Sequence, residues 1–332
     1  MNLTVSSSPH VHSGASVPSA MRDVIIALLP AFAVSVWFFE FDALRLVAVC
    51  VGTALVAEYA CRKAMRRENT LCDFSAAVTG LLLAFNLPPG LPSWMAVAGT
   101  LFAIVVAKQI FGGLGYNPFN PALAARAFLL VSCPVAMTTW TSSSWQGLDA
   151  ATTATPIDAA TSATPLGIAK MALREGQPLP FEFDPMRFYL GDINGSLGEV
   201  SAAALLLGGA YLLLRRVISW HLPVAYLLTV AAYALVLQRF FPETAWPVSF
   251  HLLSGGLILG AFFMATDWVT SPVTRTGRVI FGVGCGVLTM LIRTVPTAAY
   301  PEGVSFAILI MNAFTPLINR ATRPKPFGRK KR

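Results

Sequence analysis

The sequence predicts an all-α integral membrane protein, with about ten transmembrane helices in two five-helix halves of opposite orientation and both termini in the cytoplasm. Hydrophobic residues make up 55% of the 332 residues, charged residues make up only 12%, and the mean hydropathy is +0.64. An ordinary soluble domain carries roughly a quarter charged residues, so this composition excludes a soluble enzyme. Ten spans of about 20 residues fit this length and leave little room for a soluble domain.

Apolar windows give the expected spans in order, the third of them short. They cover residues 24–39, 45–60, 73–87, 94–111, 122–138, 199–214, 218–237, 250–266, 278–293 and 303–318. The expected organisation is a disordered cytoplasmic lead (1–21), a first half (22–138), an outer loop (139–198), a second half (199–318) and a basic cytoplasmic tail (319–332). Five spans on each side of one large loop give the two halves opposite orientations, although no residue-level match indicates a duplication.

Basic residues predict the orientation. Seven of them lie in the last thirteen positions and account for most of the net charge of +8: Arg320, Arg323, Lys325, Arg329, Lys330, Lys331 and Arg332. A basic run beside an apolar span is typical of a topogenic or lipid-headgroup segment, so we expect membrane lipid as a partner and no nucleic acid.

The remaining basic residues agree with this topology. With the N-terminus inside, the inner loops hold Arg62, Lys63, Arg66, Arg67, Lys108, Arg126, Arg215, Arg216, Arg275 and Arg278, whereas the short outer loops hold only Arg45, Arg239 and Arg293. The positive-inside rule therefore predicts a multi-pass protein of the bacterial inner membrane, with the loop 139–198 on the periplasmic side.

The five cysteines predict no metal site. They are scattered without a CxxC or Cys/His spacing, and Cys50 and Cys285 lie inside apolar runs, so they are interpreted as small core residues. Neither a metal centre nor an iron–sulfur cluster is expected.

A glycine- and asparagine-rich hairpin, residues 108–121, joins the fourth and fifth spans on the inner side. Gly112, Gly113 and Gly115 allow the backbone to approach a flat ligand, and Asn117 and Asn120 offer amide groups to a heterocycle. The same residues suit a tight helical hairpin, with glycine ending one helix and proline beginning the next, and composition alone favours that simpler interpretation.

The outer loop contains the run Asp-Ala-Ala-Thr-Ser-Ala-Thr-Pro-Leu at residues 158–166. Its small residues are expected to leave the hydroxyl of Thr164 accessible as an acceptor for a phosphoryl-linked group. Composition alone favours an exposed linker rich in alanine and threonine.

This run resembles the flavinylation motif of a family of membrane subunits. The family includes the D subunit of the Rnf electron-transport complex and the B subunit of the sodium-translocating NADH:quinone oxidoreductase, and the shorter length favours the Rnf branch. The hairpin 108–121 and the segments 191–199, 251–256, 261–267 and 300–303 are also similar, in the family order. The likeness runs from about Arg22 to the tail, and Ser162 departs from it because glycine is common there.

The resemblance implies that Thr164 carries FMN through a phosphoester bond made by a separate flavin transferase on the outer side. It also implies a second, noncovalent flavin, riboflavin, near the inner face, where the hairpin residues Gly112, Gly113, Gly115, Asn117 and Asn120 are the candidate wall. Four further candidate cofactor-binding residues lie near the outer ends of spans: Gly195, Ser196, His251 and Ser254.

Each of these outer residues also has a simpler explanation. Gly195 and Ser196 precede the sixth span, where a helix N-terminus favours an anion such as a flavin phosphate, and an N-cap role is equally compatible. His251 opens the eighth span, where it suits either a flavin contact or a polar anchor. Asp267 ends that span, and carboxylates within a membrane often mark function.

The implied function is electron transfer between ferredoxin and NAD, coupled to transport of Na⁺ or H⁺, by a redox subunit that is not a stand-alone catalyst. No dinucleotide-binding fingerprint follows a strand, so other membrane and peripheral subunits must exchange electrons with NADH. They would include a second flavinylated subunit on the outer side. Two alternatives are a flavin-free secondary transporter with inverted repeats and a purely structural anchor.

Overall fold

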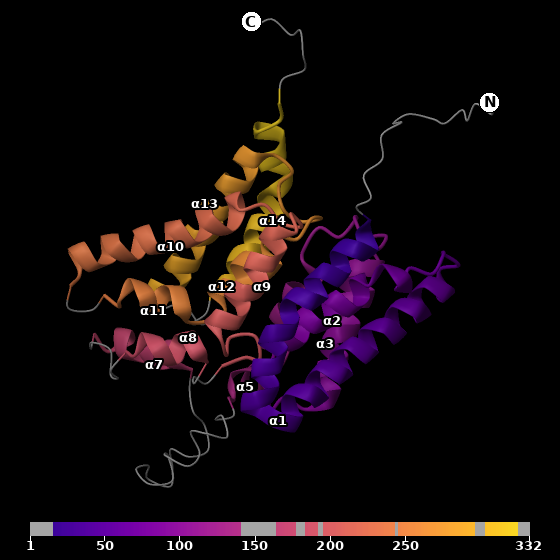
Figure 1. The fold of residues 1–332 in the computed structure, drawn as a ribbon, viewed down its shortest axis with the longest axis horizontal. Helices are drawn as coiled ribbons and strands as arrows, with labels where there is room; N and C mark the ends of the chain where they lie inside the picture. Colours follow the sequence, from indigo (N-terminus) through magenta and orange to yellow (C-terminus); the bar gives the residue numbers. More distant parts are fainter. Residues whose placement is uncertain are drawn as a thin grey trace, which may run out of the picture.

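Helices occupy all ten segments in which the hydropathy pattern predicts a span. The computed structural model describes residues 16–140, 164–176, 183–191, 195–242, 245–295 and 303–324, and these ranges contain helices and no strand. The all-helical prediction is therefore confirmed for the described chain (Figure 1).

The first half begins with a helix bent at one residue. Helix α1 (Val17–Ala64) covers the first two predicted spans, and Glu40 interrupts it with a left-handed φ of 48°, so that two arms meet there. The elements that follow are η1 (Leu71–Asp73), α2 (Ser75–Phe85), α3 (Ser93–Leu101), its π-helical continuation η2 (Phe102–Gln109), α4 (Pro121–Ser132) and α5 (Pro134–Thr138). Helix α2 is buried along nearly its whole length, which makes it the centre of this half.

The second half contains one predicted span that is broken. Its elements are α9 (Ala202–Leu214), α10 (His221–Phe240), α11 (Val248–Leu253), α12 (Leu257–Leu259), η3 (Gly260–Met264), α13 (Arg275–Thr294) and α14 (Val304–Ala321). The eighth predicted span is not one helix but the three pieces α11, α12 and η3. Gly255 and Gly256 cause the break, because both adopt left-handed φ values of 67° and 65° that other residues rarely take.

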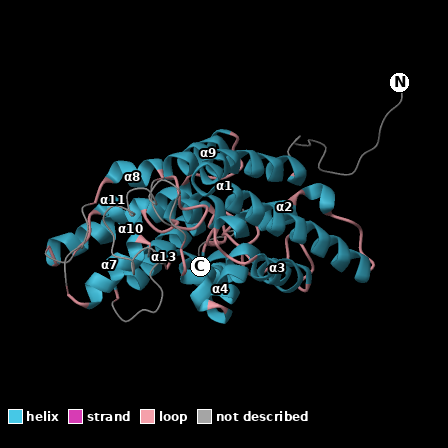
Figure 2. Cartoon of the chain, turned by 90° about the horizontal axis from the view of Figure 1, so that it is seen from below, coloured by secondary structure: helices cyan, strands magenta, loops and turns pink. Residues whose placement is uncertain are grey.

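Two short helices lie in the predicted outer loop, where no helix is expected from hydropathy. Helix α7 (Pro165–Arg174) and helix α8 (Pro185–Leu190) pack against α11 through Leu166, Ala169, Phe188, Trp246 and Phe250. Figure 2 places α7, α8, α10 and α11 together on one side of the chain and α2 and α3 on the other, with α1 and α9 between them.

The two halves contact each other through α1 and α9 and through α4 and α14. The Ser35 hydroxyl of α1 donates to the carbonyl oxygen of Leu197, which precedes α9, at 2.6 Å. Within the second half α10 and α13 pack closely, because Gly282 has no side chain at their contact. A Cβ added there would lie only 2.8 Å from the Leu222 carbonyl oxygen. Small residues at such interfaces are typical of helices packed in membranes.

Four of the described helices, α1, α10, α13 and α14, are long and apolar enough to cross a membrane. The apolar helices α2, α3 with η2, α4 and α9 are shorter. This supports a membrane protein, while the exact number of crossings and the orientation remain predictions.

Segment ends predicted to share a membrane face do lie together. At the predicted inner face Arg67 donates to the Gly112 carbonyl oxygen at 3.1 Å, and Trp268 donates to that of Val217 at 2.9 Å. At the predicted outer face Arg45 donates to the Pro89 carbonyl oxygen at 3.1 Å. The start of α1 and the end of α14 lie at the same end of the molecule in Figure 1.

We therefore expect reporters fused before Met1 and after Arg332 to be on the same, cytoplasmic side. The measurement is the activity of a reporter that works only in the cytoplasm, compared with one that works only in the periplasm. A fusion after Phe241, at the opposite end of α10, is the matched control and should report the periplasm. Periplasmic activity of the C-terminal fusion would contradict the ten-span scheme.

Candidate functional site

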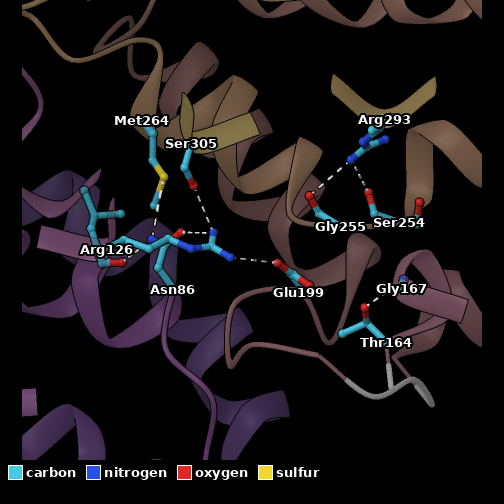
Figure 3. Close-up of polar contacts among 11 residues, drawn as sticks. Asn86, Arg126, Thr164, Gly167, Glu199, Ser254, Gly255, Met264, Arg293 and Ser305 are labelled. Carbon is cyan, nitrogen blue, oxygen red and sulfur yellow. Dashed lines mark hydrogen bonds and ion pairs between the residues drawn. The ribbon is translucent and has the colours of Figure 1, made fainter. Parts of the chain in front are cut away.

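Thr164, the residue predicted to carry FMN, is the N-cap of α7. Its backbone is extended, Pro165 takes the first helical position, and its Oγ1 accepts a hydrogen bond from the backbone N–H of Gly167 at 3.1 Å (Figure 3). Its side chain is only 5% exposed. The expectation that its small neighbours leave the hydroxyl freely accessible is therefore wrong for this conformation. The hydroxyl is covered because α7 starts against the second half.

Helix α7 is held on the second half at two points. The Leu166 side chain lies against Gly255, where an added Cβ would approach Leu166 Cδ2 to 2.7 Å. The Lys170 Nζ donates to the Ile292 carbonyl oxygen at 2.6 Å, near the C-terminus of α13, where a cation is favoured. Burial, followed by the charges of Arg174 and Arg293, lowers the pKa of Lys170 to about 8, so the ammonium form still predominates at neutral pH.

Arg293 ties the broken span to α13. It is fully buried and donates to three carbonyl oxygens, those of His251 at 2.6 Å, Ser254 at 2.9 Å and Gly255 at 3.2 Å. These carbonyls lie at the end of α11, where helical partners are lacking. The assignment of Arg293 to an outer loop is therefore wrong, since the guanidinium serves as a buried cap instead (Figure 3).

Several predicted outer residues meet near this cap. His251 and Ser254 are buried at 1% and 2% exposure, and neither His251 Nδ1 nor Ser254 Oγ has a hydrogen-bond partner among the described residues. Ser196 is buried with an equally unpartnered Oγ. The N-cap of α9 is Ser201, whose hydroxyl accepts from the Ala204 N–H at 3.3 Å, so the proposed capping role of Ser196 is wrong.

Glu199 links this outer cluster to the first half. Cβ atoms added to Gly195 and Gly256 would each lie 3.0 Å from one of its carboxylate oxygens, so the two glycines make room for the carboxylate. Its Oε1 is 3.9 Å from Arg126 Nη2, and both side chains are buried. Figure 3 shows the Arg126 guanidinium lying between Asn86 and Glu199.

Arg126 lies within α4 rather than in the inner loop expected from the topology. Its Nη1 donates to Asn86 Oδ1 at 2.9 Å and to Ser305 Oγ at 3.1 Å. The loop assignment is wrong because this side chain is 6% exposed and bonds to both halves. Asn86 continues the chain of contacts, since its Nδ2 lies 3.7 Å from Met264 Sδ. The Met264 carbonyl oxygen in turn accepts from Asn120 Nδ2 at 3.3 Å.

Asn120 leads to a cavity at the predicted inner face. The cavity has a volume of about 90 Å³, and its polar lining includes Lys108, Asn117, Asn120, Thr266 and Asp267. This volume is smaller than the roughly 300–1,000 Å³ of small-molecule sites, so a ring-sized ligand needs the lining side chains to move apart. The two asparagines predicted as a wall therefore do line a cavity.

The hairpin glycines play a different part. Gly112, Gly113 and Gly115 all have left-handed φ values, of 124°, 99° and 97°, and they do not line the cavity. Asn120 caps α4, accepting from the Ala122 N–H at 3.0 Å, and Pro121 follows it. The simpler interpretation of a tight helical hairpin is thus confirmed, and the asparagines face the cavity as well.

A buried ion pair supports one wall of this cavity. Lys108 Nζ lies 2.8 Å from Glu58 Oε2 and donates to Ser75 Oγ at 2.7 Å, while Thr70 donates to Glu58 Oε1 at 2.8 Å. Lys108 is 1% exposed, so its assignment to an inner loop is also wrong. A buried charge is tolerated because each of its partners is present.

Sequence reasoning missed the residues that connect these places: Asn86, Arg126, Trp246, Arg293, Lys170 and the Glu58–Lys108 pair. For the charged residues of this set the available signal was a charge next to or inside an apolar run, which is costly and marks function or pairing. The uncharged Asn86 and Trp246 gave no such signal. Cys50 and Cys285 are buried as expected, Cys72 is exposed, and the described residues include no group of ligands suited to a metal ion. The motif residues 158–163, 192–194 and 300–302 lie outside the described residues.

Comparisons with known proteins cover nearly the whole chain. The model of the NQR2, RnfD, RnfE family matches residues 4–328. The chain is 47% identical over 329 residues to the D subunit of the Na⁺-translocating ferredoxin:NAD⁺ oxidoreductase complex of Acetobacterium woodii, covering 99% of this chain and 96% of that protein. It is 44% identical over 332 residues to the D subunit of the proton-translocating ferredoxin:NAD⁺ oxidoreductase complex of Clostridium ljungdahlii, covering 98% and 96%.

A third relative comes from another bacterium. The D subunit of the ion-translocating oxidoreductase complex of Halorhodospira halophila is 42% identical over 347 residues, which cover 97% of this chain and 94% of that protein.

Proposed function

The chain belongs to the NQR2, RnfD, RnfE family, and from that membership we propose that it is the D subunit of an ion-translocating ferredoxin:NAD⁺ oxidoreductase complex. Its apolar helices agree with a place in the bacterial inner membrane. Two of the relatives are named for different ions, Na⁺ and the proton, so either ion suits the proposal.

Thr164 is the proposed attachment residue for FMN, and the geometry of its hydroxyl supports this. The oxygen accepts a hydrogen bond from the Gly167 N–H, and among the described residues no acceptor is bonded to the hydroxyl hydrogen. Esterification replaces that hydrogen and keeps the accepting lone pair. The start of a ten-residue helix also favours a phosphate.

With FMN attached to Thr164, the cofactor and the chain would have different roles. A bound flavin supplies the electron chemistry, while the chain supplies position, hydrogen bonding and exclusion of water. Lys170 and Leu166 fix α7, and Arg293 fixes the end of α11 beside it. Electrons would pass to partner subunits, including a second flavinylated subunit on the outer side, and a flavin transferase would mature the chain.

The inner cavity is the proposed site of the second flavin, riboflavin. Asn117 and Asn120 bring amide groups to its wall, beside apolar side chains such as Val78 and Phe262. Because Asn120 also caps α4, Asn117 is the better residue for a test: its Nδ2 bonds only locally, to the Phe119 carbonyl oxygen at 3.0 Å.

We expect Asn117→Leu to release the noncovalent flavin. The loss of one or two hydrogen bonds weakens binding roughly tenfold, and the larger apolar side chain narrows the cavity. The measurement is the amount of riboflavin extracted from the acid-precipitated complex, with the exposed Asn69→Leu as the control. Riboflavin retained in the Asn117→Leu complex at the level of Asn69→Leu would place the second flavin elsewhere.

The experiment that tests the proposed function uses membrane vesicles. In a host whose own D subunit is deleted, expression of this chain with the other subunits should restore ferredoxin-dependent NAD⁺ reduction. It should also restore an ion gradient that an ionophore collapses. If the chain is present in the membrane but neither activity is restored, the assignment is contradicted.

A further inference from the structure

A second, larger cavity lies at the predicted inner face, beside the one that Asn117 and Asn120 line. It has a volume of about 770 Å³, within the roughly 300–1,000 Å³ of small-molecule sites. It lies between the end of α9, the start of α10 and the start of α13. Its lining includes Arg216, Arg275 and Arg278, and no acidic side chain is among the described residues that line it. The cavity therefore suits an anion.

Two of the three guanidinium groups have no bonding partner within the part of the chain that the structure describes. Arg278 is held in place, because its Nη1 donates to Ser219 Oγ at 2.9 Å and its Nε donates to the Pro272 carbonyl oxygen at 3.1 Å. Arg216 and Arg275 are exposed, and their side chains make no hydrogen bond or ion pair there. Their donors are therefore available to a ligand.

Two tryptophans indicate that the anion is part of a lipid. Trp220 and Trp268 both line the cavity and are 59% and 51% exposed, and tryptophan is enriched at the depth of lipid headgroups. Trp268 Nε1 donates to the Val217 carbonyl oxygen at 2.9 Å, which fixes the position of its ring. Most of the remaining lining is apolar: Leu213, Val217, Ile218, Leu222, Pro272 and Val273. Such walls suit the glycerol and acyl part of a lipid better than a free, hydrated anion.

We propose that this cavity binds the phosphodiester headgroup of an anionic phospholipid of the inner leaflet. Arg216 and Arg275 supply the hydrogen bonds, because a guanidinium group matches two oxygens of a phosphate. The N-terminus of α13, a helix of 20 residues, also favours an anion. Basic pockets between membrane helices on the cytoplasmic side are typical sites for such headgroups. The site depends on neither candidate flavin.

The bound lipid would also support the inner cavity. Four residues line both cavities and so form a shared wall: Val217, Ile218, Thr266 and Trp268. A headgroup and its acyl chains would cover the outer side of this wall.

Arg216 can be replaced without loss of the fold. It follows the C-cap of α9 with a left-handed φ of 57°, and the Val217 N–H donates to the Leu212 carbonyl oxygen at 3.0 Å, in a motif that usually has glycine at this position. Arg216→Gly therefore removes the charge and relieves the backbone. Arg66 has the same position after α1, with a φ of 53°, and does not line the cavity. Arg66→Gly is thus a control matched in charge and backbone.

The test uses the whole complex in vesicles of phosphatidylcholine with a small fraction of a phosphatidylglycerol probe, which carries a photoreactive diazirine beside its headgroup. After irradiation, peptide mass spectrometry should find the label in segments 217–222 and 268–275, and unlabelled phosphatidylglycerol should compete for it. Arg216→Gly should lower this labelling roughly fivefold, through the loss of one cation at the membrane surface. Arg66→Gly should leave it unchanged.

The sources of the anion are separated by two further measurements. Equal labelling by a phosphatidylcholine probe would overturn the proposal, because the cavity would then not select an anion. Displacement of the label by inorganic phosphate would overturn it as well, because the site would then take a free anion. It is also overturned if both segments stay unlabelled, as they would beneath a partner subunit, or if Arg216→Gly and Arg66→Gly are labelled equally.

Discussion

The Thr164→Ala chain, coexpressed with a flavin transferase, should be dark under ultraviolet light on a denaturing gel, where the wild-type chain fluoresces yellow. The substitution removes the only atom that can form the proposed ester at this position, so the expected loss is complete. Alanine also removes the N-cap, at a cost of about 0.5–2 kcal/mol, which is too little to unfold the chain.

Two controls separate chemistry from folding. Thr164→Ser keeps the hydroxyl and the cap and should keep the fluorescent band. Thr139→Ala removes an exposed hydroxyl that bonds only to the Val135 carbonyl oxygen, and it should leave the band unchanged. A fluorescent Thr164→Ala band would move the attachment to another residue, and a dark wild-type band would favour the flavin-free transporter.

The largest effect on stability is expected from Arg126→Met. This change leaves Glu199 buried opposite an apolar side chain and removes the hydrogen bonds to Asn86 and Ser305. Removing one partner of a buried pair costs about 3–5 kcal/mol. The measurement is thermal unfolding of the purified chain in detergent, and the exposed Arg239→Met on α10 is the matched control.

A double-mutant cycle isolates the pair itself. Glu199→Gln removes the charge and keeps the shape, so Arg126→Met combined with Glu199→Gln should be more stable than Arg126→Met alone. If Arg126→Met unfolds at the temperature of Arg239→Met, the pair does not join the halves energetically. If the double variant is the least stable of the series, the unpaired carboxylate is not the cause.

The sequence predicted the positions of the helices well, because an apolar stretch of helix length is stable in a membrane or in a protein core. It also predicted the hairpin at Gly112, since glycine is typical of the end of a helix and proline of the start of the next. It missed the break at Gly255 and Gly256, because a window of average hydropathy does not register a change in φ. The amphipathic helix α7 was missed for a related reason, being too short and too polar for the window.

The buried charges were mispredicted for a different physical reason. Counting basic residues for topology treats each as solvated, whereas Lys108, Arg126 and Arg293 are buried against partners far away in the chain. Such partners become visible only when the helices are packed. Local motifs therefore predicted that the hairpin asparagines line a site, and they single out Thr164, whose role stays a prediction. The polar contacts that lie between these residues required the structure.

Those contacts give the two candidate flavin sites a shared framework. From the start of α7, contacts pass through Gly255 and Gly256 to Glu199, then across the interface of the halves to Arg126. They continue through Asn86 and Met264 to Asn120 at the inner cavity. A buried network holds its members in one arrangement when each is satisfied, and here Glu199 Oε1 meets Arg126 as an ion pair but has no hydrogen-bond partner among the described residues.

The central claim is that Thr164 bears the cofactor, and peptide mass spectrometry of the mature chain tests it most directly. Protein purified from cells that contain a flavin transferase should yield the peptide spanning residues 158–166 heavier by one FMN less one water. Fragmentation should place that mass on Thr164. The same peptide recovered quantitatively without added mass, from cells in which the transferase modifies a known substrate, would contradict the account.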